Sequence, residues 1–202
     1  MRKGQILLVL AAAVSVQFVA AAAMAGTHAH SRTGFYIGLG AGMASADTEP
    51  GSATSLVVAD LSREGGAAGN FRLGWALTEN LTLGLENSTW FRSYAISGTN
   101  VDANLKLNVT ALAMTFFPSN MGLYLRGGIG VGATGIELTQ GTTSVSGSEV
   151  GVGLVGAIGY EWRLTTRFAF GPQVEWAFMG TDGEDTGSAN FTSLTAQGTW
   201  YW

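Results

Sequence analysis

Cysteine is absent from the 202 residues, and the chain has little proline and little charge, with 3 prolines and charged residues at 12 %. Without cysteine, a disulfide scaffold, a zinc–thiolate site and a cysteine nucleophile are all excluded. Glycine is plentiful, at 30 residues, but the lack of proline and of a Gly-X-Y period excludes collagen. A soluble domain carries about 25 % charged residues, so a value near half of that needs a physical cause.

Hydrophobic residues make up 47 % of the chain, and there are 6 Trp, 5 Tyr and 10 Phe. Such aromatic content with so little charge excludes intrinsic disorder. The length predicts one domain. The composition therefore leaves two interpretations, an unusually apolar soluble protein or a chain that is partly solvated by lipid.

The N-terminal segment has the three parts of an export signal: the basic residues Arg2 and Lys3, an apolar core at 6–13, and Ala23-Met24-Ala25. We predict a signal peptide at 1–25, cleaved near Ala25, and a mature chain at 26–202. A membrane anchor at 6–25 is the alternative. The mature chain has an excess of acidic residues and no basic stripe, so no nucleic-acid partner is expected. No later run of about 20 apolar residues could form a spanning helix.

The mature sequence alternates between apolar and polar residues with a period of two, which is typical of strands. Eight segments follow this pattern: 34–46, 68–78, 81–91, 101–117, 123–136, 149–162, 167–179 and 191–202. Connections after the second, fourth and sixth segments are short, whereas those after the other segments are longer, such as 47–66 and 180–190. This alternation favours an all-β fold, an eight-stranded antiparallel up-and-down barrel that spans an outer membrane, over a soluble sandwich.

The charges within the strands support this interpretation, because each lies opposite its strand's large apolar residues. They are Arg72, Glu86, Lys106, Arg126, Glu161 and Glu175. On the fourth segment, for example, Leu105, Leu107 and Val109 are predicted to face lipid and Lys106 the lumen. Arg or Lys facing the middle of a bilayer costs about 2–4 kcal/mol, so charges should point inward.

The six inward charges are the candidate functional residues. Arg72 and Glu86 are equally distant from the Glu79 turn and should face one another, and Arg126 and Glu161 lie on adjacent strands. The network is either a structural plug of salt bridges or a polar gate on a narrow water path. We favour the plug, because eight strands leave an interior that side chains just fill.

Four other features have an ordinary structural explanation. Gly151-Val-Gly153-Leu-Val-Gly156 matches a dinucleotide fingerprint, but the strand pattern continues after it where a helix is required, and we predict glycines facing the lumen. His28 and His30 precede the first strand, and Asp182, Glu184 and Asp185 lie in a loop, so no metal site, cofactor or catalytic residue is expected. Aromatic residues near strand ends are predicted to form interfacial girdles: Trp75, Trp90, Trp162, Trp176, Trp200 and Tyr160.

The chain resembles the small outer-membrane barrels of Gram-negative bacteria, the OmpA-like or porin-family β-barrel domain. The resemblance covers about 33–202 and rests on Gly-Phe-Tyr-Ile-Gly-Leu-Gly-Ala-Gly at 34–42, Gly159-Tyr160-Glu161-Trp162 and the terminal aromatic Trp202. It implies that the assembly machinery reads the last strand, with Trp200 and Trp202 as its signal. The chain stops at the barrel, so the peptidoglycan tether of the full OmpA architecture is not expected.

The leading hypothesis is a non-enzymatic outer-membrane protein that supports envelope integrity or surface interaction through its loops. A narrow channel for small or apolar solutes is the alternative, and a lipid A-modifying enzyme is a third class. The expected partners are outer-membrane lipid, lipopolysaccharide and the assembly machinery, and the protein is expected to be a monomer. A small barrel hosts many functions, so its fold does not choose among them.

Overall fold

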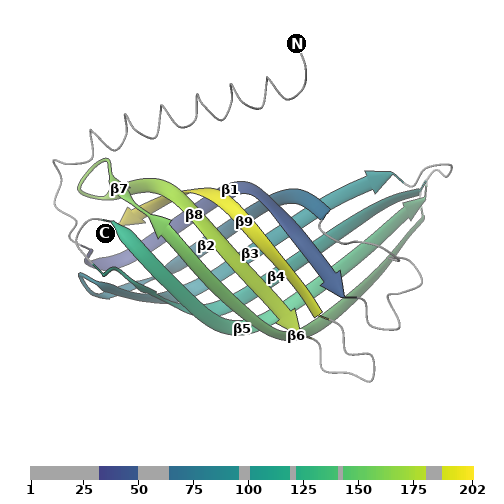
Figure 1. Ribbon diagram of the computed structural model, residues 1–202, viewed down its shortest axis with the longest axis horizontal. Coiled ribbons are helices and arrows are strands. Elements are labelled where there is room, and N and C mark those ends of the chain that lie inside the picture. Colours follow the sequence, from purple (N-terminus) through teal and green to yellow (C-terminus); the bar gives the residue numbers. More distant parts are fainter. Residues whose placement is uncertain (1–31, 50–63, 96–100, 119–121, 141–142, 181–187) are drawn as a thin grey trace, which may run out of the picture.

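The computed structural model describes residues 32–49, 64–95, 101–118, 122–140, 143–180 and 188–202 (Figure 1). These residues form nine antiparallel strands: β1 (Gly34–Glu49), β2 (Glu64–Thr78), β3 (Leu81–Ala95), β4 (Val101–Phe116), β5 (Leu123–Gln140), β6 (Thr143–Tyr160), β7 (Trp162–Arg163), β8 (Phe168–Gly180) and β9 (Ser188–Tyr201). The predicted signal peptide lies outside the described residues. Among the residues described, no helix is long and apolar enough to cross a membrane.

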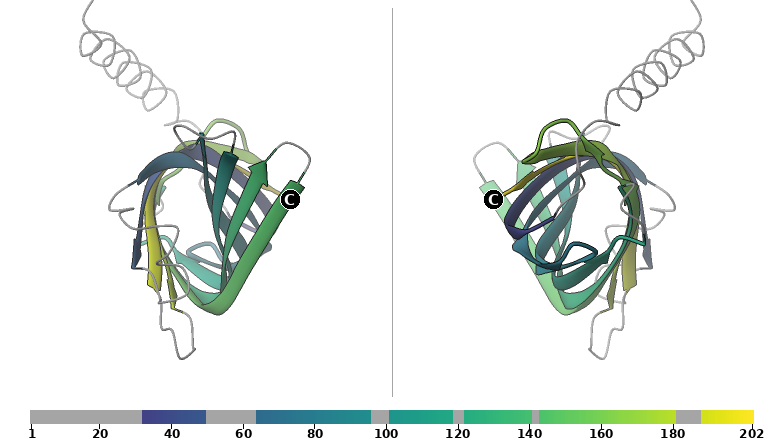
Figure 2. Two further views of the ribbon diagram at one scale, coloured as in Figure 1. Left: turned by 90° about the vertical axis from the view of Figure 1, so that its right-hand side faces the viewer. Right: turned by 90° about the vertical axis from the view of Figure 1, so that its left-hand side faces the viewer.

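The strands close into a barrel, which Figure 2 shows as a ring around a central lumen. Neighbouring strands pair in the order β6-β5-β4-β3-β2-β1-β9-β8-β7, and an additional pairing of β6 with β8 closes the ring. The short β7 continues the wall position of β6 after the interruption at Glu161, so the barrel has eight wall strands. The predicted eight-stranded antiparallel barrel is confirmed.

The barrel has two ends. The turn end carries Glu79–Asn80 and the connections at 117–122 and 164–167, and the loop end is opposite. At the turn end Gly122 has φ 94°, and a Cβ there would collide with the carbonyl oxygen of Glu161, so this turn requires glycine.

Connection lengths do not alternate as strictly as the sequence predicted. β5 and β6 pair without a break from Leu123↔Tyr160 to Gln140↔Thr143, so most of the loop predicted at 137–148 is strand. β3 and β4 likewise pair up to Ala95↔Asp102. Threonine, serine and valine suit extended backbone as well as loops, which is why composition placed the strand ends too early.

The outer surface is apolar in most strands, as the alternation predicted. Leu39, Trp75, Leu125 and Ile158 are each 48–58 % exposed on the outer face, while the alternating residues are buried inside. Such an exposed apolar surface is the expected one for a barrel whose solvent is lipid.

The fourth segment is the exception, and the prediction for it was wrong. Leu105, Leu107 and Val109 are 8 %, 4 % and 2 % exposed and face the lumen, whereas Lys106 is exposed on the outer face. The turn-end half of β4 explains the orientation. There the outward residues are the large Leu112, Met114 and Phe116, and the inward ones are the small Ala111 and Ala113.

Aromatic residues gather at both ends of the apolar outer surface. At the turn end Phe168 lies against Trp200 with ring centroids 4.6 Å apart, and Phe35 contacts Trp75 and Trp202 at 5.4 and 5.9 Å. Trp176 and Phe178 stack nearer the loop end, at 5.9 Å. Trp90, in contrast, is 1 % exposed and points into the lumen, so its predicted place in a girdle was wrong.

Candidate functional site

The centre of the lumen holds a buried ion pair between two strands that are not neighbours. Nη1 of Arg126, on β5, lies 2.7 Å from Oε1 of Glu86, on β3, and both side chains are 1 % exposed. The intervening strand β4 contributes Ala111, the Cα partner of Glu86, and Ala113 to the same inner face. Small side chains there leave room for the guanidinium to reach across β4.

Polar side chains of two further strands complete this layer. Gln173 Oε1 accepts hydrogen bonds from Tyr124 Oη and Arg126 Nη1, both at 2.8 Å, and its Nε2 donates to Oε2 of Glu175 at 2.7 Å. Arg126 Nε also donates to Thr115 Oγ1 at 3.1 Å. We refer to Glu86, Thr115, Tyr124, Arg126, Gln173 and Glu175 as the central layer. All six are buried, and hydrogen bonds of this kind are what a buried charge requires.

The opposite wall of the lumen carries a second polar chain. Arg72 Nη2 donates to Gln197 Oε1 and to Thr199 Oγ1, both at 3.1 Å, and Gln197 Nε2 donates to Asn70 Oδ1 at 2.8 Å. Gly38 makes this possible, because a Cβ there would lie 2.9 Å from Nε of Arg72. Glycine on the inner face therefore makes room for the long side chain.

The turn end is covered by a third group, which includes a residue that precedes the first strand. Arg32 is fully buried; its guanidinium lies 3.4 Å from the centre of the Phe117 ring, and its Nε lies 3.5 Å from Oε2 of Glu161. Tyr201 Oη donates to the Glu161 carboxylate at 2.9–3.0 Å. Arg163 stacks over the Tyr201 ring at 4.0 Å. These five residues form the turn-end cover.

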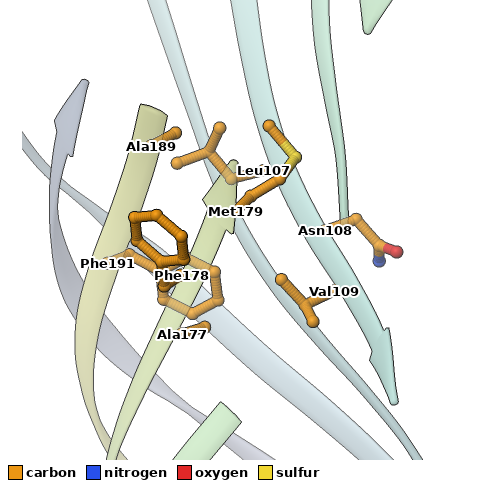
Figure 3. A pocket seen from close by; sticks show the side chains of 8 residues that line it. All are labelled: Leu107, Asn108, Val109, Ala177, Phe178, Met179, Ala189 and Phe191. Atoms are coloured by element: carbon orange, nitrogen blue, oxygen red, sulfur yellow. The ribbon is translucent and has the colours of Figure 1, made fainter. Parts of the chain in front are cut away.

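The loop-end half of the lumen is apolar. Figure 3 shows Leu107 and Met179 facing Ala189 and Phe191 around a small cavity, with the side chain of Asn108 directed away from it. The same apolar cluster includes Trp90, Leu105 and Val109. The cavity measures only about 10 Å³, so this half is packed by its own apolar side chains, and the central layer lies directly beneath it.

Five of the six predicted lumen charges lie inside the barrel: Arg72, Glu86, Arg126, Glu161 and Glu175. Lys106 is the exception, because β4 turns its apolar face inward. Arg72 and Glu86 are Cα partners, as predicted, but the side chain of Glu86 pairs with Arg126. Glu161 lies with Arg32 and not with Arg126. The sequence could not reveal these partners, since side chains reach across an intervening strand.

Several residues of the site were missed. Arg32 and Arg163 lie beside or between the predicted strands, and Tyr124, Gln173 and Tyr201 are uncharged. Their signal was present in the alternation, since residues 124, 173 and 201 fall on the inward face of their strands. The pattern of charges alone does not reveal these residues, because three of them are uncharged and the other two lie outside the predicted strands.

The glycine motif lies within strand β6, as predicted, so no helix follows it. Gly153 faces the lumen, but Gly156 lies on the outer face with open space where a Cβ would be, which corrects its predicted lumen position. Among the described residues no group of three or more acidic or histidine side chains could hold a metal ion. The predicted positions His28, His30, Asp182, Glu184 and Asp185 lie outside the described residues. Trp200 and Trp202 are on the outer face at the turn end.

A family model described as "Outer membrane protein beta-barrel domain" matches residues 6–198. The fold is also similar to three solved outer-membrane or surface proteins. Ail, the attachment invasion locus protein of Yersinia pestis, is 13 % identical with a TM-score of 0.57, over 83 % of this chain and 99 % of that one. Neisserial surface protein A is 15 % identical, also at 0.57, over 84 % and 98 % of the two chains. OprG from Pseudomonas aeruginosa is 13 % identical at 0.50, over 85 % and 98 %. No curated protein matches the chain.

Proposed function

This chain belongs to the outer membrane protein β-barrel domain family and resides in an outer membrane, and on that premise we propose that it is a non-enzymatic surface protein. Its barrel is closed to ions and solutes. Its protruding loop-end sheet, formed by β4, β5 and β6, binds a partner outside the cell. A signal peptide at 1–25 and recognition of Trp200 and Trp202 by the assembly machinery belong to the same proposal.

The packing of the lumen supports a closed barrel. In the central layer Glu86 and Arg126 form an ion pair, and in the turn-end cover Arg32 lies over Phe117, closer to the turn end of the barrel. An ion that passed through would have to separate buried partners at both levels. Removing one partner of a buried ion pair costs about 3–5 kcal/mol.

The single observation that carries the surface role is a free strand edge. β8 pairs with β6 only from Gln173↔Gly159 to Gly180↔Val152, whereas β6 begins at Thr143 and continues to pair with β5. Within the part of the chain that the structure describes, no strand pairs with residues 143–151 on the side away from β5. Figure 1 shows β5 and β6 running well past the end of β8.

This edge has few of the features by which proteins block strand addition. The segment 143–151 contains neither lysine nor proline, and its one charged residue is Glu149. Residues 147–150 are exposed on both faces of the sheet, with Val150 64 % exposed. An exposed edge with unpaired N–H and C=O groups is a template for an added strand, a recurring mode of peptide recognition.

Planar-bilayer recording tests whether the barrel is closed. We expect purified full-length protein to give no stable conductance steps. Steps in the wild type that disappear in Glu86→Gln would overturn the closed barrel in favour of a gated pore.

A strand peptide tests the edge. A fluorescein-labelled ten-residue peptide of alternating Thr and Val should bind the folded protein and slow amide hydrogen exchange in 143–151. Gly147→Lys should weaken binding, because a charge on a strand edge opposes pairing. Gly135→Lys, on the internal strand β5, is the matched control. Equal binding by both variants would reject strand addition at β6.

A second candidate, a path for small apolar solutes, is favoured by the apolar loop-end half of the lumen. Leu107, Met179 and Phe191 line it, and the path ends at the central layer. A small apolar dye should then bind the wild type and bind Leu107→Asp more weakly. Absence of dye binding to the wild type would remove this candidate.

A further inference from the structure

The outer wall of the barrel changes from apolar to polar halfway along β3 and β4. Nearest the turn end the outward residues are Leu81, Leu83 and Leu85 on β3 and Phe116, Met114 and Leu112 on β4. Above them four successive outer-face pairs follow: Asn87↔Thr110, Thr89↔Asn108, Phe91↔Lys106 and Ser93↔Asn104. The seven polar residues of these pairs form what we name the β3–β4 patch.

The lower part of the patch satisfies its own hydrogen bonds. Asn87 Nδ2 donates to Asn108 Oδ1 at 3.1 Å and to Thr110 Oγ1 at 2.8 Å. Asn108 Nδ2 donates to Asn87 Oδ1 at 3.1 Å and to Thr89 Oγ1 at 2.7 Å. A polar group in hydrocarbon costs several kcal/mol when unsatisfied, so this closed network can lie against acyl chains.

The height of the patch follows from strand geometry. With a rise of about 3.3 Å per residue and a tilt near 40°, Asn87 lies about 15 Å above Leu81 along the barrel axis, and Lys106 lies about 25 Å above Phe116. The apolar band of such a barrel is about 25 Å tall. Lys106 therefore reaches the headgroup boundary of the outer leaflet, while Asn87 and Thr110 lie below it, beside the upper acyl chains.

The wall two strands away from β3, formed by β1, has no such patch at this level. On β1 the outward apolar residues continue from Phe35 to Met43, which is 70 % exposed, and this spans about 20 Å along the axis, twice the apolar height of β4. The β3–β4 patch is also accessible from its side. Gly135, the β5 partner of Lys106, has open space where a Cβ would be.

From this geometry we infer that the β3–β4 patch binds lipopolysaccharide of the outer leaflet. The Lys106 ammonium pairs with a phosphate at the headgroup boundary, since a charge-assisted contact is the strongest that the patch offers. Asn104 and Ser93 lie at the level of sugar hydroxyls. Asn108 lies near where amide-linked and hydroxylated acyl chains join the sugar, which a phospholipid does not provide, and Thr110 lies below it beside the chains. The inference rests on the outer-membrane location and not on the proposed closed barrel or strand edge.

The one charge of the patch, on Lys106, agrees with an anionic ligand. Among the described residues no carboxylate pairs with Lys106. Glu137 is exposed on the outer face of β5, at the level of its Cα partner Asn104. Its negative charge partly offsets the positive charge of Lys106 and should weaken the binding of an anion.

Native mass spectrometry of the full-length protein, titrated with purified lipopolysaccharide in detergent, measures this binding. Loss of one charge-assisted contact is expected to weaken binding about tenfold in Lys106→Gln, whereas Lys106→Arg keeps the affinity. Asn108→Leu should also weaken binding. Thr192→Leu, on the outer face of β9, is the matched control and should bind as the wild type does. Glu137→Gln should bind at least as tightly as the wild type. A heat-modifiable gel shift establishes that each variant is folded.

Three results would overturn the inference. They are equal affinity of the wild type, Lys106→Gln and Asn108→Leu for lipopolysaccharide, binding of phosphatidylglycerol as tight as that of lipopolysaccharide, and a two-chain species that Lys106→Gln stabilises. Dephosphorylated lipopolysaccharide should bind the wild type as weakly as intact lipopolysaccharide binds Lys106→Gln. If it binds with full affinity, the assigned role of Lys106 is wrong.

Discussion

In the turn-end half of the barrel polar side chains fill the lumen and apolar ones face outward, whereas in the loop-end half of β3 and β4 the two kinds change places. Arg126 and Glu86 pair inside the first half. In the second half Leu107 lies inside and Lys106 outside. One strand, β4, passes through both regions without a break in its alternation. Alternation therefore separates two faces, and the large outward residues of the turn-end half decide which face meets lipid.

The largest effect should come from breaking the central ion pair. Glu86→Ala leaves the Arg126 guanidinium buried without its carboxylate, which is expected to cost about 3–5 kcal/mol in the free energy of unfolding. Urea titration in micelles measures it. The control is Glu137→Ala, an exposed residue for which we expect about 0.5 kcal/mol or less. Equal losses in the two variants would contradict a lumen organised around this pair.

The apolar half can be tested on β4 itself. Leu107→Ala removes a buried lumen side chain and should cost about 3 kcal/mol, a transfer term plus a cavity term. Leu112→Ala, 54 % exposed on the outer face, should cost less, because lipid or detergent fills the space. If Leu112→Ala proved the more costly change, the assigned faces of β4 would be reversed.

A substitution in the turn-end cover tests whether this group stabilises the barrel, closes it to ions, or does both. Arg32→Ala removes a desolvated cation–π contact with Phe117, worth about 2 kcal/mol, and the ion pair to Glu161. The unfolding free energy should fall by about that amount. Planar bilayers should stay silent, since the central layer remains. Conductance steps in this variant would show that Arg32 alone closes the barrel.

The smallest effect should come from the outer wall. Asn108→Leu removes four hydrogen bonds of the β3–β4 patch but adds apolar surface facing lipid, which offsets part of the loss. Hydrogen bonds between side chains in membranes average about 0.6 kcal/mol, so we expect a net change within about 1 kcal/mol. A loss above about 3 kcal/mol in micelle unfolding would place Asn108 inside the barrel.

Much of this architecture could be predicted from the sequence, and the errors share a physical cause. In seven wall strands small or charged residues alternate with large apolar ones, such as Phe71 on β2 and Ile129 on β5. This difference identifies which face of each strand points to lipid. On β4 both faces are largely apolar at one end, and only residue size, Leu112 and Met114 outside against Ala111 and Ala113 inside, distinguishes them. A pattern that scores alanine and leucine alike misses that signal.

Which side chains pair inside the lumen depends on how far each side chain extends across the barrel. Arg126 pairs with Glu86 across β4, and Arg32, which precedes the first strand, packs on Phe117 at the turn end. Neither distance follows from spacing along the chain. The strand ends near Gln140 and Thr143 were missed for another reason, because Ser and Thr are compatible with both loop and strand.

The pairing of β1 with β9 has a consequence for how the barrel forms. Trp202 N donates to Phe35 O at 2.9 Å, and the register runs from Tyr36↔Tyr201 to Glu49↔Ser188. The first strand to be synthesised must therefore keep its edge unsatisfied until the ninth arrives. The chain must lose the conformational entropy of closing this long loop before the contacts between β1 and β9 can form. Folding of topologies with such high contact order is therefore slow. During that interval the unpaired edge of β1 is exposed to aggregation.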